Sequence, residues 1–201
     1  MVVGAVVLAA GASLRMGSPK AILRIGDETF VQHIVGQLHD AGVRDVVVVL
    51  GADADEIRSS LSWFGGTIVV NHGWKEGQLT SVVAGLNAFG NRKPDGVVIC
   101  PVDRPLISHT LIDDLIKAFR ESGKSIVIPV CQGRRGHPTV FSSRMFDSLR
   151  DAPVTVGARH VVRNHPNDVL EVSTGEESCI LNIDTQDDYE SHVAHVYRGK
   201  G

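Results

Sequence analysis

The chain alternates between short runs of β-branched apolar residues and segments whose apolar residues recur with helical spacing. The apolar runs are continuous, which is typical of strands that are buried on both faces of a sheet. In the segment 28–42, Phe30, Ile34 and Leu38 recur every four residues, and Gly42 supplies a helix stop. Strands are therefore predicted at 2–9, 45–52, 67–71, 95–103, 125–130, 138–141, 168–173 and 178–184, and helices at 28–42, 79–89, 108–123 and 185–196.

This alternation predicts an α/β fold, namely a single Rossmann-like three-layer domain over residues 1–201 with a mostly parallel, mixed sheet. The segment GRRGHPTVF (133–141) follows the strand at 125–130 closely and is expected to run antiparallel to its neighbours. No repeat, low-complexity segment or linker divides the chain. In open sheets of this kind, ligands bind at the carboxyl ends of the strands. The polar residues directly after each strand are therefore the candidates for function.

Composition narrows the class of protein. Hydrophobic residues make up 43% and charged residues 21%, as in an ordinary globular protein, and the net charge of -3 argues against general nucleic-acid binding. The three cysteines form no CxxC motif, so neither a disulfide framework nor a zinc site is expected, and a reducing cytoplasm fits. The apolar N-terminal run resembles a signal peptide, but no Lys or Arg precedes it, so a buried first strand is the favoured interpretation.

The loop LAAGASLRMGSPK (8–20) leaves the first predicted strand with two cations and two glycines. It is not a Walker A loop, because Lys20 follows no glycine and no Ser or Thr follows Lys20, and it is not GxGxxG. Pro19 disfavours helix at Ser18, so the loop is expected to stay irregular through Lys20. Such a loop can direct backbone N–H groups and two cations at a polyphosphate; the alternative is a solvated loop with two surface cations. Its pattern is G-x3-R-x-G-x2-K, formed by Gly11, Arg15, Gly17 and Lys20.

Two aspartates, Asp103 and Asp184, stand at the ends of predicted strands. Magnesium in proteins takes one or two carboxylates together with substrate phosphates and waters, so the pair fits a Mg²⁺ site facing the loop. The alternative is that each aspartate caps a turn. Thr185 and Asp188 have the spacing of a capping box and are interpreted as structural.

A third group of candidates surrounds the start of the helix predicted at 79–89. The free N–H groups of such a helix start can bind anionic or carbonyl oxygens. Ser81 could equally be an ordinary helix residue, and Trp74 could either stack on a ligand or pack the loop. The other candidates here are Asn71, Gly73 and Gly77.

The loop at 8–20 resembles the signature loop of the nucleotidyltransferases that act on the molybdenum cofactor, most closely the cytidylyltransferase branch. Four further segments resemble that family's motifs, in the family's order along the chain. They are NHGWKEGQLTSVVAGL (71–86), CPVDRPLI (100–107), GRRGHPTVF (133–141) and LNIDTQDD (181–188).

The resemblance implies roles for individual residues. The implied catalytic residues are Arg15, Lys20 and Asp103, the metal ligands Asp103 and Asp184, and the acceptor-binding residues Arg104, His137 and Arg159. Nucleotide binding is implied for Leu8, Ala9, Ala10, Gly11, Arg15, Lys20, Asn71, Gly77, Ser81 and Asp103.

The chain departs from the family pattern at two places on the acceptor side. Thr155 and Val156 precede Gly157, where the family carries an acid, and Arg104 occupies a D-x-P position that more often holds an uncharged residue. For His137, the alternative to acceptor binding is a role confined to a tight turn that enters a strand.

The implied activity is Mg²⁺-dependent transfer of CMP from CTP to the phosphate of molybdopterin, with release of pyrophosphate. A transient contact with the enzyme that receives the cofactor is also implied, whereas no nucleic-acid or membrane partner is expected. The guanylyl branch carries glycine where Ala10 stands, which predicts CTP in preference to GTP. The alternatives are another cytidylyl-, guanylyl- or sugar-phosphate nucleotidyltransferase, or a nucleotide-binding regulatory protein without turnover.

Overall fold

The computed structural model describes residues 1–194 as a domain built on one central sheet. Its strand order is β10-β7-β9-β6-β1-β4-β5, with β8 paired to β7. β1 runs parallel to β4 and β6, whereas β9 runs antiparallel to both β6 and β7, so the sheet is mixed and mostly parallel, as predicted. The strands are β1 Val3–Ala9, β4 Val46–Leu50, β5 Thr67–Val70, β6 Gly96–Pro101, β7 Ile126–Cys131, β8 Arg134–Arg135, β9 Thr139–Ser142 and β10 Val169–Ser173, with a separate small hairpin of β2 Arg24–Ile25 and β3 Glu28–Thr29.

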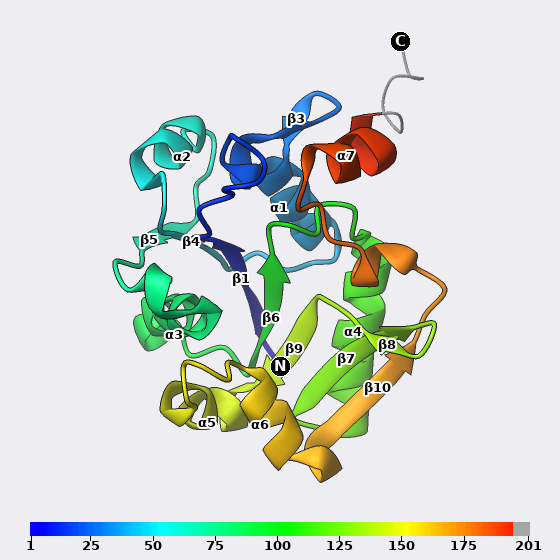
Figure 1. Cartoon of the computed structure of the whole chain (residues 1–201). Helices are drawn as coiled ribbons and strands as arrows, with labels where there is room; N and C mark the ends of the chain where they lie inside the picture. The colour runs from blue at the N-terminus through cyan, green and yellow to red at the C-terminus, as the bar shows by residue number, and fades with distance from the viewer. Residues whose placement is uncertain (195–201) are drawn as a thin grey trace.

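Helices cover both faces of the sheet, which gives three layers (Figure 1). Successive side chains of a strand point to opposite faces, and in β1 the side chains of Ala5 and Val7 pack with α1 and α4 while those of Val6 and Leu8 pack with α3 and α5. Among residues 1–194, none of the helices combines the length and apolar character that crossing a membrane requires. The α-helices are α1 Phe30–Asp40, α2 Ala54–Ser60, α3 Gln78–Ala88, α4 His109–Ser122, α5 Phe146–Asp151, α6 Arg159–Asn164 and α7 Gln186–Tyr189.

The connections around β1 create a crevice at its carboxyl end. α1 leads from β1 toward β4 over one face, and α3 leads from β5 back to β6 over the opposite face. The strand order therefore reverses beside β1, and in open α/β sheets a ligand binds at such a switch point. Because β1 and β6 are adjacent parallel strands, the loops that follow them lie side by side at this edge of the sheet.

The prediction of a strand at 178–184 is wrong. That segment forms a short 3₁₀ helix, Glu177–Ile180, followed by irregular chain, and its backbone groups bond to single residues instead of to a ladder. The Cys179 carbonyl accepts from the His137 N–H, and the Ile183 N–H donates to the Asp103 carbonyl at 2.8 Å. Cys179 and Ile183 are fully buried, so the apolar character that suggested a strand comes from packing across the end of the sheet.

The other predicted strands are present within one to two residues, as are the helices that correspond to α1, α3 and α4. The predicted helix at 185–196 begins with α7, capped by the expected Thr185–Asp188 capping box, and continues as a π-helical turn, Glu190–Ala194. Its last two residues lie outside the described part. α2, α5 and α6 were not predicted, because each is only six or seven residues long and shows little periodicity.

Candidate active site

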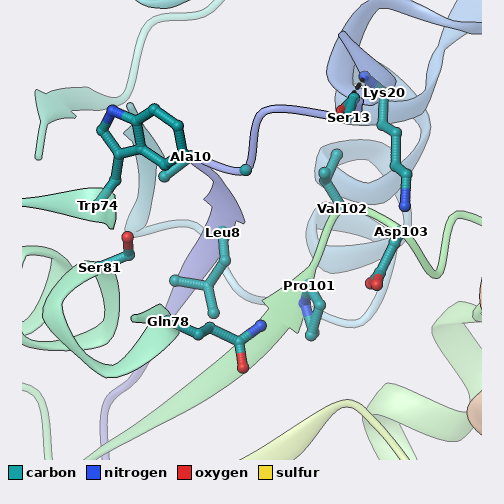
Figure 2. A pocket seen from close by; sticks show the side chains of 11 residues that line it. Leu8, Ala10, Ser13, Lys20, Trp74, Gln78, Ser81, Pro101, Val102 and Asp103 are labelled. Atoms are coloured by element: carbon teal, nitrogen blue, oxygen red, sulfur yellow. Dashed lines mark hydrogen bonds between the residues drawn. The ribbon is translucent and has the colours of Figure 1, made fainter. Parts of the chain in front are cut away.

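A cavity of about 220 Å³ opens at the carboxyl ends of β1 and β6 (Figure 2). Residues from the first loop, from the turn after β5 and from the end of β6 meet here, as the switch point requires. It is lined by Leu8, Ala10, Gly11, Ser13, Lys20, Trp74, Gln78, Ser81, Pro101, Val102 and Asp103.

The loop after β1 keeps an open backbone and fixes Lys20. A Cβ added at Gly11 would meet no atom within 4 Å, so the backbone is accessible there. Ser13 has a φ of 48°, a left-handed conformation that is strained for a residue other than glycine, and its Oγ accepts from the Lys20 N–H at 3.0 Å. The loop is irregular through Pro19, and Lys20 opens a 3₁₀ helix, Lys20–Ile22, so the irregular segment ends one residue earlier than predicted.

The two loop cations converge on Asp184. Lys20 Nζ donates a short, charge-assisted hydrogen bond to Asp184 Oδ1, and Arg15 Nη2 lies 3.5 Å from Asp184 Oδ2. The hydrogen bond from Lys20 is the main reason that the pKa of Asp184 is lowered below its ordinary value. The side chain of Lys20 is only 11% exposed whereas that of Arg15 is 68% exposed, so Lys20 is held in the site and Arg15 reaches over it from solvent.

Asp103 lies beside this ion pair, and its pKa shifts in the opposite direction from that of Asp184. Its Oδ1 is buried and has no hydrogen-bond partner among the described residues. Burial raises the pKa of Asp103, although the nearby Lys20 and Arg104 oppose that shift. A buried carboxylate oxygen without a partner is costly in a folded protein, so an interaction with a ligand or cation would stabilise it.

These two carboxylates fit a divalent cation that is shared with a phosphate ligand. The Asp103 carbonyl accepts from the Ile183 N–H at 2.8 Å, which brings the chain around Asp184 against the end of β6. Within residues 1–194, no group of three or more His, Cys, Asp or Glu side chains could enclose a metal by itself. Magnesium needs only one or two protein carboxylates when phosphate and water complete its shell, so the residues present suit that arrangement.

The turn after β5 is held together by Asn71. The buried Asn71 amide donates to Thr80 Oγ1 at 2.8 Å and to Ser81 Oγ at 3.0 Å, and its Oδ1 accepts from the Gly73 N–H at 2.9 Å. Asn71 does not line the cavity, whereas Ser81 does. In this structure Asn71 therefore positions the start of α3 and Ser81.

A second, larger cavity of about 880 Å³ adjoins the first, since Gln78 lines both. His137, Arg159 and Gly77 lie on its wall, together with an apolar floor. Burial is the main cause that lowers the pKa of His137 to about 4, with the charge of Arg104 adding to it, so the ring is neutral at pH 7. Its Nδ1 has no hydrogen-bond partner among the described residues.

Arg104 lies apart from both linings. Its guanidinium donates through Nη1 to the Cys179 carbonyl, which also accepts from the His137 N–H. Arg104 thereby ties the turn after β6 to the segment that carries Asp184.

The structure thus places six of the predicted residues on the lining of the first cavity and three, Gly77, His137 and Arg159, on the lining of the second. Ala9 is buried, and within residues 1–194 the ion pair of Arg15 is the one with Asp184. Ser13 and Gln78 were missed, and the only signal was their position inside motifs that had been singled out. The residues that line the first cavity as predicted are Leu8, Ala10, Gly11, Lys20, Ser81 and Asp103.

Known proteins resemble this chain over nearly its whole length. The chain is 32% identical over 191 residues to nicotine blue oxidoreductase of Paenarthrobacter nicotinovorans, covering 90% of this chain and 91% of that protein. It is 27% identical to a probable molybdenum cofactor guanylyltransferase of Mycobacterium avium, covering 94% and 93%. A crystal structure of Rv0371c from Mycobacterium tuberculosis in complex with manganese superposes with a TM-score of 0.79 at 25% identity, covering 96% and 98%.

A nucleotidyl transferase from Methanothermobacter, at 22% identity and a TM-score of 0.83, shares the fold over 98% of both chains. The family described as MobA-like NTP transferase domain matches residues 5–169, which include the loop, the turn after β5 and Asp103. The chain therefore belongs to the MobA-like NTP transferase domain family and is a nucleotidyltransferase of that type.

Proposed function

We propose that this chain transfers a cytidylyl group from CTP to the terminal phosphate of molybdopterin or its molybdenum-loaded form, with Mg²⁺ and with release of pyrophosphate. The observation that carries nucleotidyl transfer is the convergence of an open loop, a buried lysine and an unpartnered carboxylate on one cavity. The choices of CTP and Mg²⁺ rest on the loop sequence and on the paired aspartates, and the choice of molybdopterin is supported by relatives named molybdenum cofactor guanylyltransferases.

The reaction needs positioning and charge neutralisation and no protein nucleophile. The acceptor phosphate would attack the α-phosphorus in line while pyrophosphate departs from the opposite side. Lys20 would neutralise the triphosphate and the leaving group, and Arg15 would add a charge from the exposed side of the loop. Asp103 and Asp184 would hold the cation, which when bound supplies positive charge to the reacting phosphates.

The acceptor would occupy the second cavity, with its phosphate directed toward Gln78. His137 and Arg159 lie on the wall of that cavity, and Arg104 would act indirectly, by fixing the turn next to Asp103. Molybdopterin is the acceptor that the family favours, and the product would pass to the enzyme that uses the cofactor.

Ala10 supports CTP as the donor. Its side chain lines the first cavity, and the Ala10 carbonyl is fixed by the Ala52 N–H at 3.0 Å, so the wall cannot easily retreat. A methyl group at this position narrows the space for a base and suits a pyrimidine better than a purine. Glycine would allow a closer approach of the backbone.

The decisive test measures pyrophosphate release with molybdopterin and each NTP. We expect a higher kcat/KM for CTP than for GTP, and we expect Ala10→Gly to erode the preference by roughly 1–3 kcal/mol, the usual worth of one such group in a pocket. Release of pyrophosphate with GTP in preference to CTP would overturn the cytidylyl proposal and leave nucleotidyl transfer in place.

Two kinds of relative motivate the competing assignments. The probable molybdenum cofactor guanylyltransferases, at 27–29% identity, make GTP the second candidate donor. The relative at 32% identity is named nicotine blue oxidoreductase, and that name makes an oxidoreductase reaction the second candidate activity. Absence of pyrophosphate release with every NTP in the presence of molybdopterin would favour that activity over nucleotidyl transfer.

A further inference from the structure

The chain has two tryptophans, and they differ in what surrounds them. Trp63 is a surface residue, 40% exposed, whose indole Nε1 donates to the Ser60 carbonyl at 2.9 Å and whose ring packs edge-on against Phe64. Trp74 follows β5 and lines the first cavity. Within residues 1–194, the Trp74 indole N–H has no hydrogen-bond partner, and the charge of Lys75 lies 5.5 Å from the centre of its ring.

Trp74 and Ala10 form one wall of the first cavity, and both lie in close contact with Gly51. A Cβ at Gly51 would lie 2.6 Å from the Ala10 carbonyl oxygen and 2.8 Å from both the Ala10 Cβ and the Trp74 Cβ. No side chain fits there, so the ends of β1 and β4 and the turn after β5 approach as closely as backbone permits. The Cβ of Trp74 therefore cannot move closer to β4, and the base of this side chain is fixed beside Ala10.

The position of Trp74 relative to the charges shows which part of a nucleotide it would meet. Figure 2 shows Trp74 and Ala10 on one side of the cavity, with Lys20 and Asp103 on the other. A triphosphate drawn to Lys20 would direct the nucleoside of the same molecule toward Trp74. An aromatic ring stacks readily on a base, since every base has a π-face.

We propose that Trp74 is the base-stacking residue of the nucleotide site and that, together with Ala10, it selects a single-ring pyrimidine base over a purine. This inference rests on the proposed nucleotidyl transfer, because it takes the first cavity as the site of the nucleoside triphosphate. Trp74 supplies the stacking surface, and the wall fixed by Gly51 limits the width of the base.

Intrinsic fluorescence can test this directly, because Trp63→Phe leaves Trp74 as the only tryptophan. We expect CTP with Mg²⁺ to quench the emission of that variant in a saturable way, and we expect inorganic tripolyphosphate to bind by calorimetry without equivalent quenching. GTP should bind more weakly than CTP. Trp63→Phe itself should leave transferase activity unchanged, since Trp63 lies on the surface.

Replacement of Trp74 provides the second arm. Trp74→Ala should weaken CTP binding about tenfold or more, the usual effect of removing an aromatic stack from a base, and should leave the Kd of tripolyphosphate unchanged. Trp74→Phe should restore most of the affinity. Unchanged CTP affinity in Trp74→Ala would overturn the proposal. Equal loss of CTP and tripolyphosphate binding with a lowered Tm would also overturn it, since Trp74 would then only pack the loop.

The remaining outcomes separate this inference from the proposed function. If GTP binds as tightly as CTP and quenches equally, the selection of a pyrimidine is overturned. If none of the NTPs nor tripolyphosphate binds to the unmodified chain, the proposed function fails and this inference fails with it.

Discussion

Asp103 and Asp184 lie at the same edge of the sheet and are proposed to hold the same cation, yet their pKa values shift in opposite directions. Burial raises the pKa of Asp103, and its Oδ1 has no hydrogen-bond partner among the described residues. Asp184 accepts from Lys20 and faces Arg15, so its pKa is lowered. Asp103 is therefore free to accept a ligand at one oxygen, whereas the charge of Asp184 is already neutralised by Lys20.

This difference in partners indicates that ligand binding would change the contacts of Asp103 and Asp184 in different ways. Asp103 would gain a partner without losing one, which makes it a pre-organised ligand. Asp184 would exchange Lys20 for the cation, and Lys20 would exchange Asp184 for phosphate. Because both exchanges happen together, the divalent cation and the triphosphate should each improve the binding of the other, and this coupling is reciprocal.

Removal of either carboxylate charge should have the largest effect. Asp103→Asn and Asp184→Asn keep the shape of the side chain and remove the charge that holds the cation, so kcat/KM should fall on the order of a hundredfold or more in each. Pyrophosphate release at saturating Mg²⁺ measures this. Asp187→Asn is the matched control, because Asp187 is an exposed residue of the first turn of α7. Near-normal turnover in either site variant would remove that aspartate from the site.

Lys20→Ala should have opposite effects on the binding of the triphosphate and on the binding of the divalent cation. Without Lys20, triphosphate should bind about tenfold more weakly, while Mn²⁺ alone should bind more tightly, because Asp184 no longer needs to release a cation. Calorimetric titration with Mn²⁺ and with CTP, each alone, gives both affinities. Lys117→Ala, which removes an exposed surface ion pair to Asp113, is the control and should change neither. Normal CTP binding and turnover by Lys20→Ala would contradict the role of the loop in phosphate binding.

The stability of the ligand-free variants should shift in opposite directions, by a few degrees. The raised pKa of Asp103 means that its charged form destabilises the fold at neutral pH, so Asp103→Asn should raise Tm at pH 7 and lose that advantage as pH falls toward 4. The lowered pKa of Asp184 means that its charge stabilises the fold above about pH 4 and ceases to do so in more acidic solution, so Asp184→Asn should lower Tm at pH 7. Thermal unfolding at pH 4 and pH 7 without metal compares them, and shifts of the same sign at pH 7 would contradict the comparison.

The two aspartates also show how far sequence alone could lead. Asp103 follows closely on the apolar strand β6, which ends at Pro101, so its position at the edge of the sheet could be predicted. Asp184 was assigned to the end of a strand that does not exist, and it reaches the site because the Ile183 N–H donates to the Asp103 carbonyl. Such a contact joins residues far apart in the chain and leaves no periodic signal.

Similar reasoning explains the other differences. The loop at 8–20 could be singled out as a candidate phosphate-binding loop because glycines and cations at fixed spacing are a local property of the sequence. Asn71 was assigned to nucleotide binding, whereas in this structure its amide bonds the residues of its own turn. Which side chain of a turn faces inward depends on tertiary packing. The link from Arg104 to Cys179 was hidden for the same reason, since the carbonyl that it meets belongs to an irregular segment.

Arg15→Lys should have the smallest effect and should sharpen the description of Asp184. Arg15 lies 3.5 Å from Asp184 Oδ2 and its side chain is largely exposed, so solvent screens its charge and its contribution to stability is small. Its value would lie in the planar fork, which can hold two phosphate oxygens and which lysine cannot reproduce. We therefore expect kcat/KM with CTP to fall about three- to tenfold in Arg15→Lys, with Tm unchanged, and to fall further in Arg15→Ala. Kinetics at low and high salt distinguish geometry from charge. If Arg15→Lys matches the unmodified chain at both salt concentrations while Arg15→Ala does not, Arg15 contributes its charge alone. Lys20 would then be the loop cation whose exact position matters, because it pairs with Asp184 in the free chain and would pair with the triphosphate in the complex.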